Sequence, residues 1–198
     1  MEPKSATRAT TSTAPKTFQV SPCVAEFSIS TSEYLRLNPS ISGLAVGAVL
    51  FSGDRLLLIQ RASDDFAPLM WEVPGGACEA DKDATILDSV ARELWEETGL
   101  HLRRVKRHVD NVEFSDDGLH GFIWRKLTFE VEVDEGYGLG LAESRDTISA
   151  AVKPDPAEHQ DWGWARMAEV EERKWEKGRL QLMEVQRGTM LTAFGFAR

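Results

Sequence analysis

The segment Arg92–Gly99 concentrates acidic side chains that could bind a divalent cation: Glu93, Glu96 and Glu97. Helical residues are separated by about 100° of rotation, so in a helix these three carboxylates would lie within roughly 100° of arc. Like charges on neighbouring turns destabilise a helix, so this arrangement needs either ample solvent or a cation. Hard carboxylate oxygens favour Mg²⁺, Mn²⁺ or Ca²⁺ over softer metals.

A glycine turn, Gly75-Gly76, comes shortly before the acidic segment. Because glycine has no Cβ, its backbone can approach a bound ion closely, and a carbonyl can join the oxygen ligands. The two features together predict a platform for divalent cations. The plain alternative is a solvated acidic face on an ordinary helix.

A helix over residues 85–98 would position these carboxylates. Its apolar residues recur at i, i+3, i+4 and i+7 and form one packing stripe: Leu87, Val90, Ala91 and Leu94. Thr85 followed by Asp88 resembles a capping box. Gly99 suits the left-handed position that often ends a helix. The stripe lies on a face adjacent to the carboxylates, so the helix can pack and still present them.

Strands are expected on both sides of this helix, at residues 44–51, 55–60, 71–73, 102–114, 122–133 and 162–166. The first two read as a hairpin. In residues 122–133, apolar and polar side chains alternate, which predicts one buried face. The three glycines at 136, 138 and 140 predict a loop with no helix pattern after it, and a last helix is expected at about residues 179–194.

The composition of the chain excludes several classes of protein. The chain has 198 residues, Lys+Arg 23 against Asp+Glu 32, and a formal net charge of −9. An acidic total argues against a dedicated nucleic-acid binder. Two cysteines are too few for a disulfide scaffold, and the apolar runs fall short of the roughly 20 residues of a membrane helix. We therefore expect a soluble, cytoplasmic protein without a membrane partner.

The first 41 residues read differently from the rest. Residues 1–17 are rich in Ser, Thr and Ala and predict a disordered leader, with a mitochondrial targeting peptide as the less favoured alternative. Residues 18–41 read as an N-terminal extension with a short helical turn at Glu33–Leu37. The main domain is expected over residues 42–198.

The sequence Arg-Glu-Leu-x-Glu-Glu-x-Gly-Leu at residues 92–100, preceded by Pro-Gly-Gly, resembles the signature of the Nudix hydrolase family (MutT-like). The segment Trp71–Gly76 resembles the strand and turn that usually enter this signature, and the order of elements over residues 42–195 also fits. The resemblance implies an α+β Nudix fold, with a mixed β-sheet sandwiched between α-helices.

The first half of the signature departs from the family pattern. Fifteen residues separate Gly76 from Arg92, where the family has thirteen, and Ala84 stands where the family has its first Glu. A two-residue insertion could let another carboxylate take that place. The candidates are Asp83, Asp81 and Glu79.

The resemblance also implies roles for individual residues. The implied metal site consists of Gly76, Glu93, Glu96 and Glu97, with Gly75 as a neighbouring candidate. Mg²⁺ is the expected cofactor and Mn²⁺ a possible substitute. Arg92 would hold a carboxylate of the signature, or would form an ordinary i,i+4 pair with Glu96.

The implied reaction is metal-assisted hydrolysis of a diphosphate linkage, in which a carboxylate accepts a proton from the attacking water. Glu93 is one candidate for this catalytic base, and the loop residues Glu143 and Glu158 are others. For the small-molecule diphosphate substrate, Trp71 could stack on a base and Arg61 could meet a phosphate. The four histidines lack metal-ligand spacing, and we assign them no function.

Three functions fit these observations. The first, which we favour, is pyrophosphohydrolysis of a nucleoside diphosphate derivative or a related organic diphosphate. The second is a Nudix-fold binding or regulatory module, and the third is a non-hydrolytic biosynthetic enzyme on the same scaffold. A homodimer is compatible with all three.

Overall fold

The computed structural model describes residues 17–64, 67–115 and 121–197, so nearly all of the predicted leader and the turn before residue 121 lie outside the described residues. The helices are η1 (Pro22–Phe27), α1 (Thr31–Leu37), α2 (Ile86–Thr98), α3 (Leu141–Ala151), α4 (Met167–Glu172) and α5 (Glu184–Phe196). The larger strands are β2 (Gly43–Ser52), β3 (Arg55–Arg61), β5 (Leu102–Ser115), β6 (Ile123–Val133) and β7 (His159–Arg166). Four two-residue strands complete the set: β1 (Gln19–Val20), β4 (Trp71–Glu72), β8 (Lys174–Trp175) and β9 (Gly178–Arg179).

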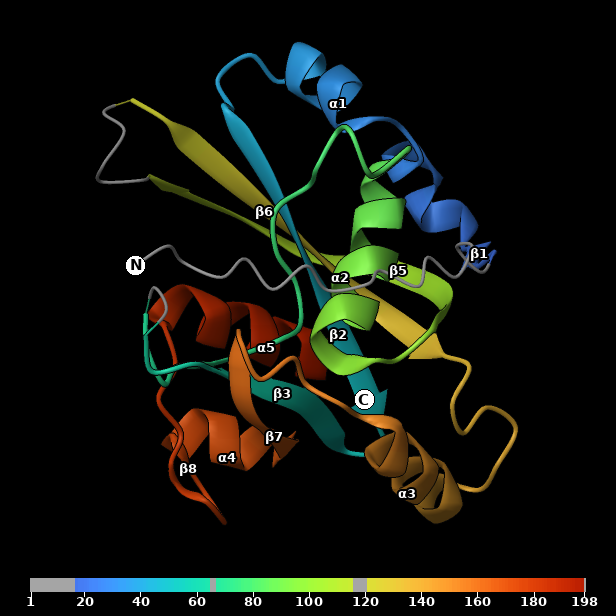
Figure 1. The fold of residues 1–198 in the computed structure, drawn as a ribbon, viewed down its shortest axis with the longest axis vertical. Helices are drawn as coiled ribbons and strands as arrows, with labels where there is room; N and C mark the ends of the chain where they lie inside the picture. Colours follow the sequence, from blue (N-terminus) through green and yellow to red (C-terminus); the bar gives the residue numbers. More distant parts are fainter. Residues whose placement is uncertain (1–16, 65–66, 116–120, 198) are drawn as a thin grey trace, which may run out of the picture.

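Seven of the described strands form one mixed sheet in the order β1-β5-β6-β2-β3-β4, with β7 paired to β3 (Figure 1). The expected hairpin is confirmed, but β2 and β3 pair over two positions only, from Phe51↔Leu56 to Ser52↔Arg55. Beyond the hairpin, β2 runs parallel to β6 and β3 runs antiparallel to β7. The two strands therefore diverge, and the chain after β4 enters the gap between them.

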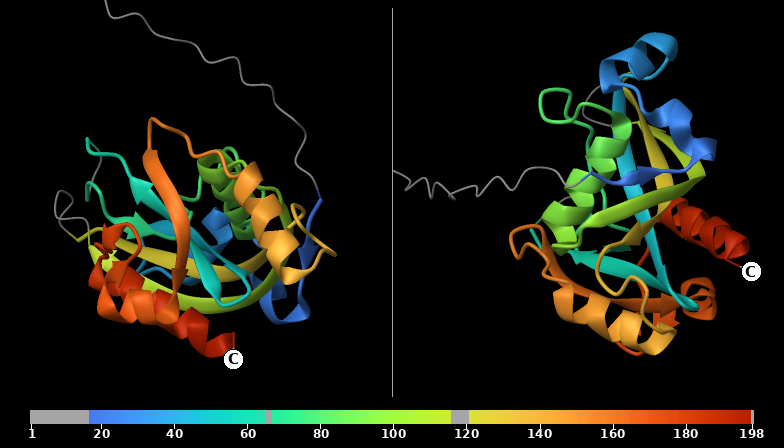
Figure 2. Two further views of the ribbon diagram at one scale, coloured as in Figure 1. Left: turned by 90° about the horizontal axis from the view of Figure 1, so that it is seen from below. Right: turned by 90° about the vertical axis from the view of Figure 1, so that its right-hand side faces the viewer.

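Helices cover both faces of the sheet (Figure 2). On one face, the apolar stripe of α2 packs with side chains of β2, β5 and β6 in one core cluster. On the other face, α4 and α5 pack against β2 and β3 in a second cluster, where Met190 and Phe194 are buried. The α+β class and the sandwiched mixed sheet are as predicted.

The central strand β6 corrects one prediction. Its apolar residues are buried as expected, but Thr128 and Glu130, expected to face solvent, are 2% and 5% exposed. The second face is closed by α5, whose Thr189 donates a hydrogen bond to Asp110 of β5. Alternating apolar residues do not distinguish a half-exposed strand from one whose polar face is covered by a helix.

The chain after the three glycines at 136, 138 and 140 also differs from the prediction. We expected no helix there, but α3 follows Gly140 directly. The residues of α3 form no strong apolar stripe, and among its described side chains Ile148 is the one buried in the core. The C-terminal helix begins at Glu184 rather than near residue 179, because α4 and the β8–β9 hairpin occupy the intervening chain.

The N-terminal extension packs on the domain. Strand β1 runs parallel to β5, and Val24 and Phe27 of η1 are buried in the same core cluster as α2. Helix α1 confirms the helical turn expected at Glu33–Leu37 and ends before Asn38. None of the described helices is long and apolar enough to span a membrane.

Helix α2 begins and ends as its sequence predicts. The Thr85 side chain accepts a hydrogen bond from the Asp88 backbone, and the Asp88 side chain accepts one from the Thr85 backbone. At the other end, Gly99 adopts the left-handed conformation with φ of 74°. Both ends of the helix that carries the acidic residues are therefore fixed locally.

We expect Thr85→Ala to lower the free energy of unfolding by about 1 kcal/mol, because it removes the side chain that caps α2. Urea denaturation followed by circular dichroism measures the change. As a control, Thr192→Ala alters an exposed threonine inside α5 and should stay within about 0.5 kcal/mol of the wild type. Equal effects of the two substitutions would contradict the capping role.

Candidate active site

Arg92 is the centre of the hydrogen bonds around the acidic face of α2. Its Nη1 donates to Glu93 at 2.8 Å and to Glu96 at 2.9 Å, and its Nη2 donates to the carbonyl of Ala77 at 2.8 Å. Both proposed roles of Arg92 are therefore present together: it holds a carboxylate of the signature and forms the i,i+4 pair with Glu96.

Asp83 is the one of the three candidate carboxylates that accepts hydrogen bonds from Arg92. It receives hydrogen bonds from Arg92 Nε at 2.9 Å and Nη2 at 2.8 Å, and one from the Ser89 hydroxyl at 2.7 Å. Burial raises the pKa of the Asp83 carboxyl, but the bonds from Arg92 and Ser89 outweigh it and hold the pKa below its ordinary value. Of the three candidates, Asp81 is exposed and Glu79 lies 3.7 Å from Arg92. The loop that contains the two-residue insertion thus brings a carboxylate into hydrogen-bond contact with Arg92.

The glycine turn lies between β2 and the acidic helix. Its backbone is tied to β2, where Val46 donates to the Gly76 carbonyl at 2.8 Å. Gly75 has φ of 151°, and a Cβ on it would lie 2.1 Å from the Val46 carbonyl oxygen. A Cβ on Gly76 would lie 2.8 Å from the Glu93 carboxylate. Gly75 requires glycine because its close neighbour is backbone, whereas the space beside Gly76 is the space next to the flexible carboxylate end of Glu93.

Glu97 lies deeper than the other carboxylates and accepts a hydrogen bond from the Gly75 backbone at 2.5 Å. Burial raises the pKa of Glu97 well above its ordinary value, and the charges of Glu72 and Glu93 raise it further. Burial likewise raises the pKa of Glu93, against the opposing effect of Arg92. Glu93 and Glu97 are 9% and 5% exposed, so the fold holds two repelling carboxylates where solvent screens them poorly.

These residues fit a divalent metal ion. The donors are carboxylate oxygens together with the Gly76 carbonyl, which has a second lone pair beside the one that Val46 uses. A cation there would relieve the repulsion that burial imposes on Glu93 and Glu97. Glu96 lies at the rim, with its side chain 44% exposed.

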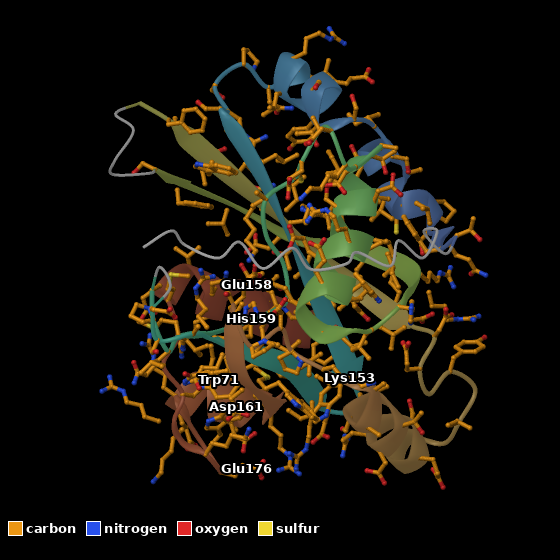
Figure 3. The ribbon with its side chains drawn as sticks, in the orientation of Figure 1. Trp71, Lys153, Glu158, His159, Asp161 and Glu176 are labelled. Carbon is orange, nitrogen blue, oxygen red and sulfur yellow. The ribbon has the colours of Figure 1, made fainter. Side chains whose placement is uncertain are left out.

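A second wall faces Glu97 from the other side. The buried Glu72 of β4 pairs with Arg61 of β3 at 2.6 Å. Burial raises the pKa of the Glu72 carboxyl, but the His159 ring and the nearby cations, Arg61 among them, bring it below its ordinary value. Glu158 and His159, at the start of β7, complete this wall (Figure 3).

Besides Glu72, His159 is a residue of this wall that the sequence did not predict. Its Nε2 lies 3.6 Å from Glu97 and 3.8 Å from Glu72. No spacing in the sequence connects residue 159 with residue 97, because the β3–β7 pairing brings them together. The only local signal was its position next to Glu158, itself a candidate for the base.

The other predicted site residues have different surroundings. Trp71 is 3% exposed and packs edge-on against Trp175, with ring centroids 4.4 Å apart, so its indole lies in the core. Arg61 supports Glu72. Glu143 lies in the first turn of α3, with its carboxylate against Gly140. Burial raises the pKa of the Cys78 thiol in the loop after the glycine turn to about 11, which disfavours the reactive thiolate.

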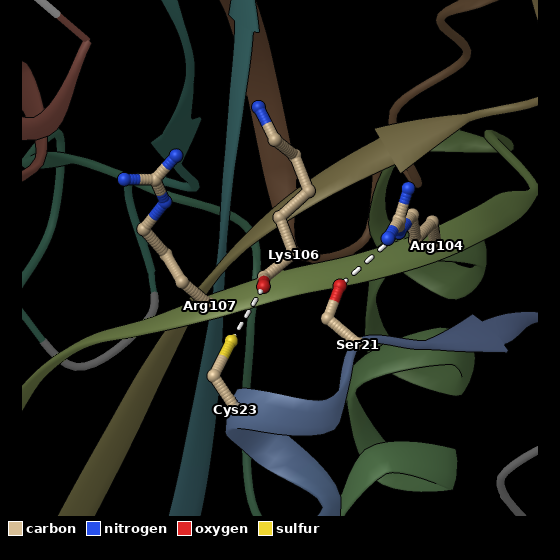
Figure 4. Close-up of a pocket in the computed structure, with 5 residues that line it drawn as sticks. All are labelled: Ser21, Cys23, Arg104, Lys106 and Arg107. Carbon is tan, nitrogen blue, oxygen red and sulfur yellow. Dashed lines mark hydrogen bonds between the residues drawn. The ribbon is translucent and has the colours of Figure 1, made fainter.

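A separate basic hollow of about 320 Å³ lies where η1 meets β5 (Figure 4). Its lining residues are Ser21, Cys23, Arg104, Lys106 and Arg107. Arg104 donates to the Ser21 hydroxyl, and Lys106 and Arg107 pair with Glu130. These contacts within the protein satisfy the cations, and the hollow contains no residue of the acidic site.

A family model described as the NUDIX domain matches residues 42–185, most of the chain. The chain belongs to the Nudix hydrolase family. Enzymes of this family act on phosphoric anhydride bonds, and the match agrees with the signature at residues 92–100.

Sequence relatives match over shorter stretches. The chain is 41% identical over 61 residues to the m7GpppN-mRNA hydrolase NUDT17 of Homo sapiens. This match covers 30% of the present chain and 18% of the relative. It is 41% identical over 66 residues to a MutT-like protein of Streptomyces ambofaciens, covering 33% of this chain and 39% of the relative. Both matches span less than half of the relative's length.

Solved structures share the fold at low sequence identity. A MutT Nudix hydrolase from Burkholderia pseudomallei is 20% identical with a TM-score of 0.54, covering 75% of this chain and 95% of that one. The Nudix domain of Shewanella oneidensis NrtR, solved with ADP ribose, is 18% identical with a TM-score of 0.55. The match covers 85% of this chain and 99% of the NrtR domain. These Nudix structures confirm the fold class.

The raised pKa of Glu97 predicts how stability depends on pH. The folded protein binds this proton more tightly than the unfolded chain, whose ordinary pKa is 4.5, so metal-free protein loses stability as pH rises above that value. Glu97→Gln removes the titration. We expect the variant to gain stability relative to the wild type as pH rises from 4 to 8, measured by urea denaturation in EDTA.

Adding Mg²⁺ or Mn²⁺ at pH 8 should reverse this order. An ion at 100 times its dissociation constant stabilises the wild type by about 2.7 kcal/mol, and we expect the variant to gain much less. Glu176→Gln, at an exposed site (Figure 3), serves as the matched control and should respond like the wild type. Equal stabilisation of wild type and Glu97→Gln by the ion would contradict a metal site at Glu97.

Proposed function

We propose that the chain is a divalent-metal-dependent pyrophosphohydrolase that cleaves a diphosphate linkage in a nucleoside diphosphate derivative or a related organic diphosphate. The observation that carries the proposal is the pair of buried carboxylates, Glu93 and Glu97, held beside the Gly75–Gly76 turn. Their mutual repulsion gives the site a need for positive charge, and a metal ion with its phosphate substrate meets that need.

Each residue of the site has a part in this proposal. Glu93 and Glu97, with the Gly76 carbonyl, hold the ion, and Glu96 contributes directly or through water at the rim. Arg92 fixes Glu93 and Glu96 in position through its hydrogen bonds. When bound, the Mg²⁺ or Mn²⁺ ion neutralises phosphate charge and lowers the pKa of water for in-line attack.

Glu158 is the residue that we propose as the catalytic base. Its carboxylate belongs to the same cluster as Glu97 and is exposed, so it can accept a proton from water at the mouth of the site and release it to solvent. The charge of Glu158 also raises the pKa of Glu93, although burial, Arg92 and Glu96 have larger effects on it. This influence is expected of two carboxylates that face the same region. Glu143 has no such contact with the acidic site among the described residues.

The relatives support the nucleotide part of the proposal. One is a hydrolase of m7GpppN-mRNA, and one structural neighbour was solved with ADP ribose. Both compounds join a nucleoside to a further group through phosphoric anhydride bonds. A binding module without turnover is less favoured, because Asp83 next to Ala84 places a carboxylate against Arg92 even though Ala84 stands where the family has a Glu.

The first test is hydrolysis of a panel of diphosphate compounds in the presence of Mg²⁺ or Mn²⁺, including ADP-ribose, capped dinucleotides and sugar nucleotides. We expect metal-dependent cleavage of at least one compound, and a loss of about 100-fold or more in kcat for Glu97→Gln. Glu176→Gln should retain wild-type rates. Full turnover by folded Glu97→Gln would refute the metal-site assignment, and inactivity of the wild type on the whole panel would favour a binding module.

The base is tested by comparing Glu158→Gln with Glu143→Gln on the preferred substrate. We expect Glu158→Gln to lower kcat by about 10²- to 10⁴-fold. Glu143→Gln should keep the wild-type rate. The opposite pattern would transfer the role to Glu143, and unchanged rates in both variants would leave Glu93 as the base.

A further inference from the structure

The start of β7 brings a histidine to the acidic site. The Glu158 carbonyl accepts a hydrogen bond from Ala62 at 2.8 Å, and the His159 backbone N–H donates to the Asp155 carbonyl at 2.8 Å. These bonds fix the chain as it enters β7, next to the end of β3. Glu158 and His159 are therefore held by backbone pairing and not by a freely moving loop.

His159 is buried and lacks hydrogen-bond partners within the part of the chain that the structure describes. Its side chain is 2% exposed, and neither Nδ1 nor Nε2 has a partner at hydrogen-bond distance. Buried polar groups normally find partners, and leaving one without any costs about 1–3 kcal/mol. An imidazole in this state needs an explanation.

The direction of the ring supplies one. Nε2 is directed at two buried carboxylates, at 3.6 Å from Glu97 and 3.8 Å from Glu72. Both distances are too long for a hydrogen bond. Glu97, Glu158 and His159 each offer one ligand atom, and these atoms lie within 4.8 Å of one another. Two ligands on opposite sides of an ion with bonds of about 2.1 Å are about 4.2 Å apart, so small side-chain shifts would close this set on an ion.

We propose that His159 supplies a nitrogen ligand to a divalent metal ion bound together with Glu97 and one oxygen of the Glu158 carboxylate, which gives the site a preference for Mn²⁺, Co²⁺ or Zn²⁺ over Mg²⁺. The second oxygen of Glu158 stays available to accept a proton. The proposal rests on the proposed function only in placing metal at Glu97. It adds a donor of a different kind, because the Nudix signature supplies oxygen atoms alone.

The chemistry of the donors sets the preference. Mg²⁺ is bound through oxygen and keeps several waters, whereas imidazole suits first-row transition metals. The buried ring of His159 also excludes water from one side of the ion. The mixed set of one nitrogen and two carboxylates therefore favours an ion that accepts both kinds of ligand.

The direct test is pulsed electron paramagnetic resonance of Mn²⁺ bound to the full chain. We expect modulation from a coordinated imidazole ¹⁴N in the wild type and its loss in His159→Gln. The matched control is His108→Gln, which changes a half-buried histidine on β5 that packs against Phe27 and Phe129. This control should keep the signal.

Calorimetric titration of each ion gives a second readout. The ratio of the Mn²⁺ to the Mg²⁺ association constant should fall at least tenfold in His159→Gln and stay unchanged in His108→Gln. Circular dichroism confirms that each variant is folded. If His159→Gln fails to fold, the wild-type spectrum remains decisive: protein labelled with ¹⁵N-histidine must then show ¹⁵N coupling in place of ¹⁴N.

Absence of histidine coupling in the wild type, or its persistence in folded His159→Gln, would overturn the proposal and leave His159 as a neighbour of Glu72 and Glu97 alone. This result is separable from failure of the proposed function. If nitrogen coupling is seen but no diphosphate is hydrolysed, His159 is a metal ligand and the proposed hydrolase activity is wrong. If a diphosphate is hydrolysed but no nitrogen coupling is seen, the hydrolase activity stands and His159 is not a ligand.

Discussion

The Arg92 guanidinium carries five N–H donors, and all of them meet acceptors that belong to one loop and one helix. Asp83 takes two of the hydrogen bonds, and Glu93, Glu96 and the Ala77 carbonyl take one each. The loop after the glycine turn and the acidic face of α2 are joined through this single side chain. Because Arg92 lies beside Glu93 and away from Glu97, it compensates one flank of the acidic cluster more than the other.

That asymmetry gives the site its electrostatic character. On the Arg92 flank, charge and hydrogen bonds are matched, and Asp83 is readily ionised. On the Glu97 flank, Glu72 and Glu93 add negative charge around a carboxylate that is already buried. The fold thus retains a local repulsion that costs stability when no cation is bound, as functional sites commonly do. The packing of α2 at its apolar stripe and its fixed caps offset this cost.

The diverging strands determine what faces the repelling flank. The short β2–β3 hairpin lets β3 leave β2 and pair with β7, while the glycine turn follows β2 on its other side. Glu72, Glu158 and His159 are thereby brought opposite α2 from segments more than 80 residues apart. The side of the site formed by Glu72, Glu158 and His159 is a consequence of sheet topology. The opposite side, formed by the carboxylates of α2, is a consequence of helix periodicity.

This difference explains how much could be predicted from the sequence. Helix α2, its capping box, its glycine cap and the hairpin follow from local patterns, and the structure confirms them. The choice of Asp83 among three carboxylates required the geometry of the loop, and the burial of Thr128 and Glu130 required the helix that covers them. Helix α3 escaped prediction because its apolar stripe is weak. His159 could not be predicted as a site residue, because its neighbours depend on long-range strand pairing and local residue spacing carries no information about that pairing.

In the function that we propose, α2 and the glycine turn hold a divalent ion between them. Crystals grown with Mn²⁺ and measured at the manganese absorption edge would locate the ion directly. We expect an anomalous peak within coordination distance of both Glu93 and Glu97, next to Gly76. A peak confined to exposed acidic side chains elsewhere, or no peak at saturating Mn²⁺, would contradict the claim.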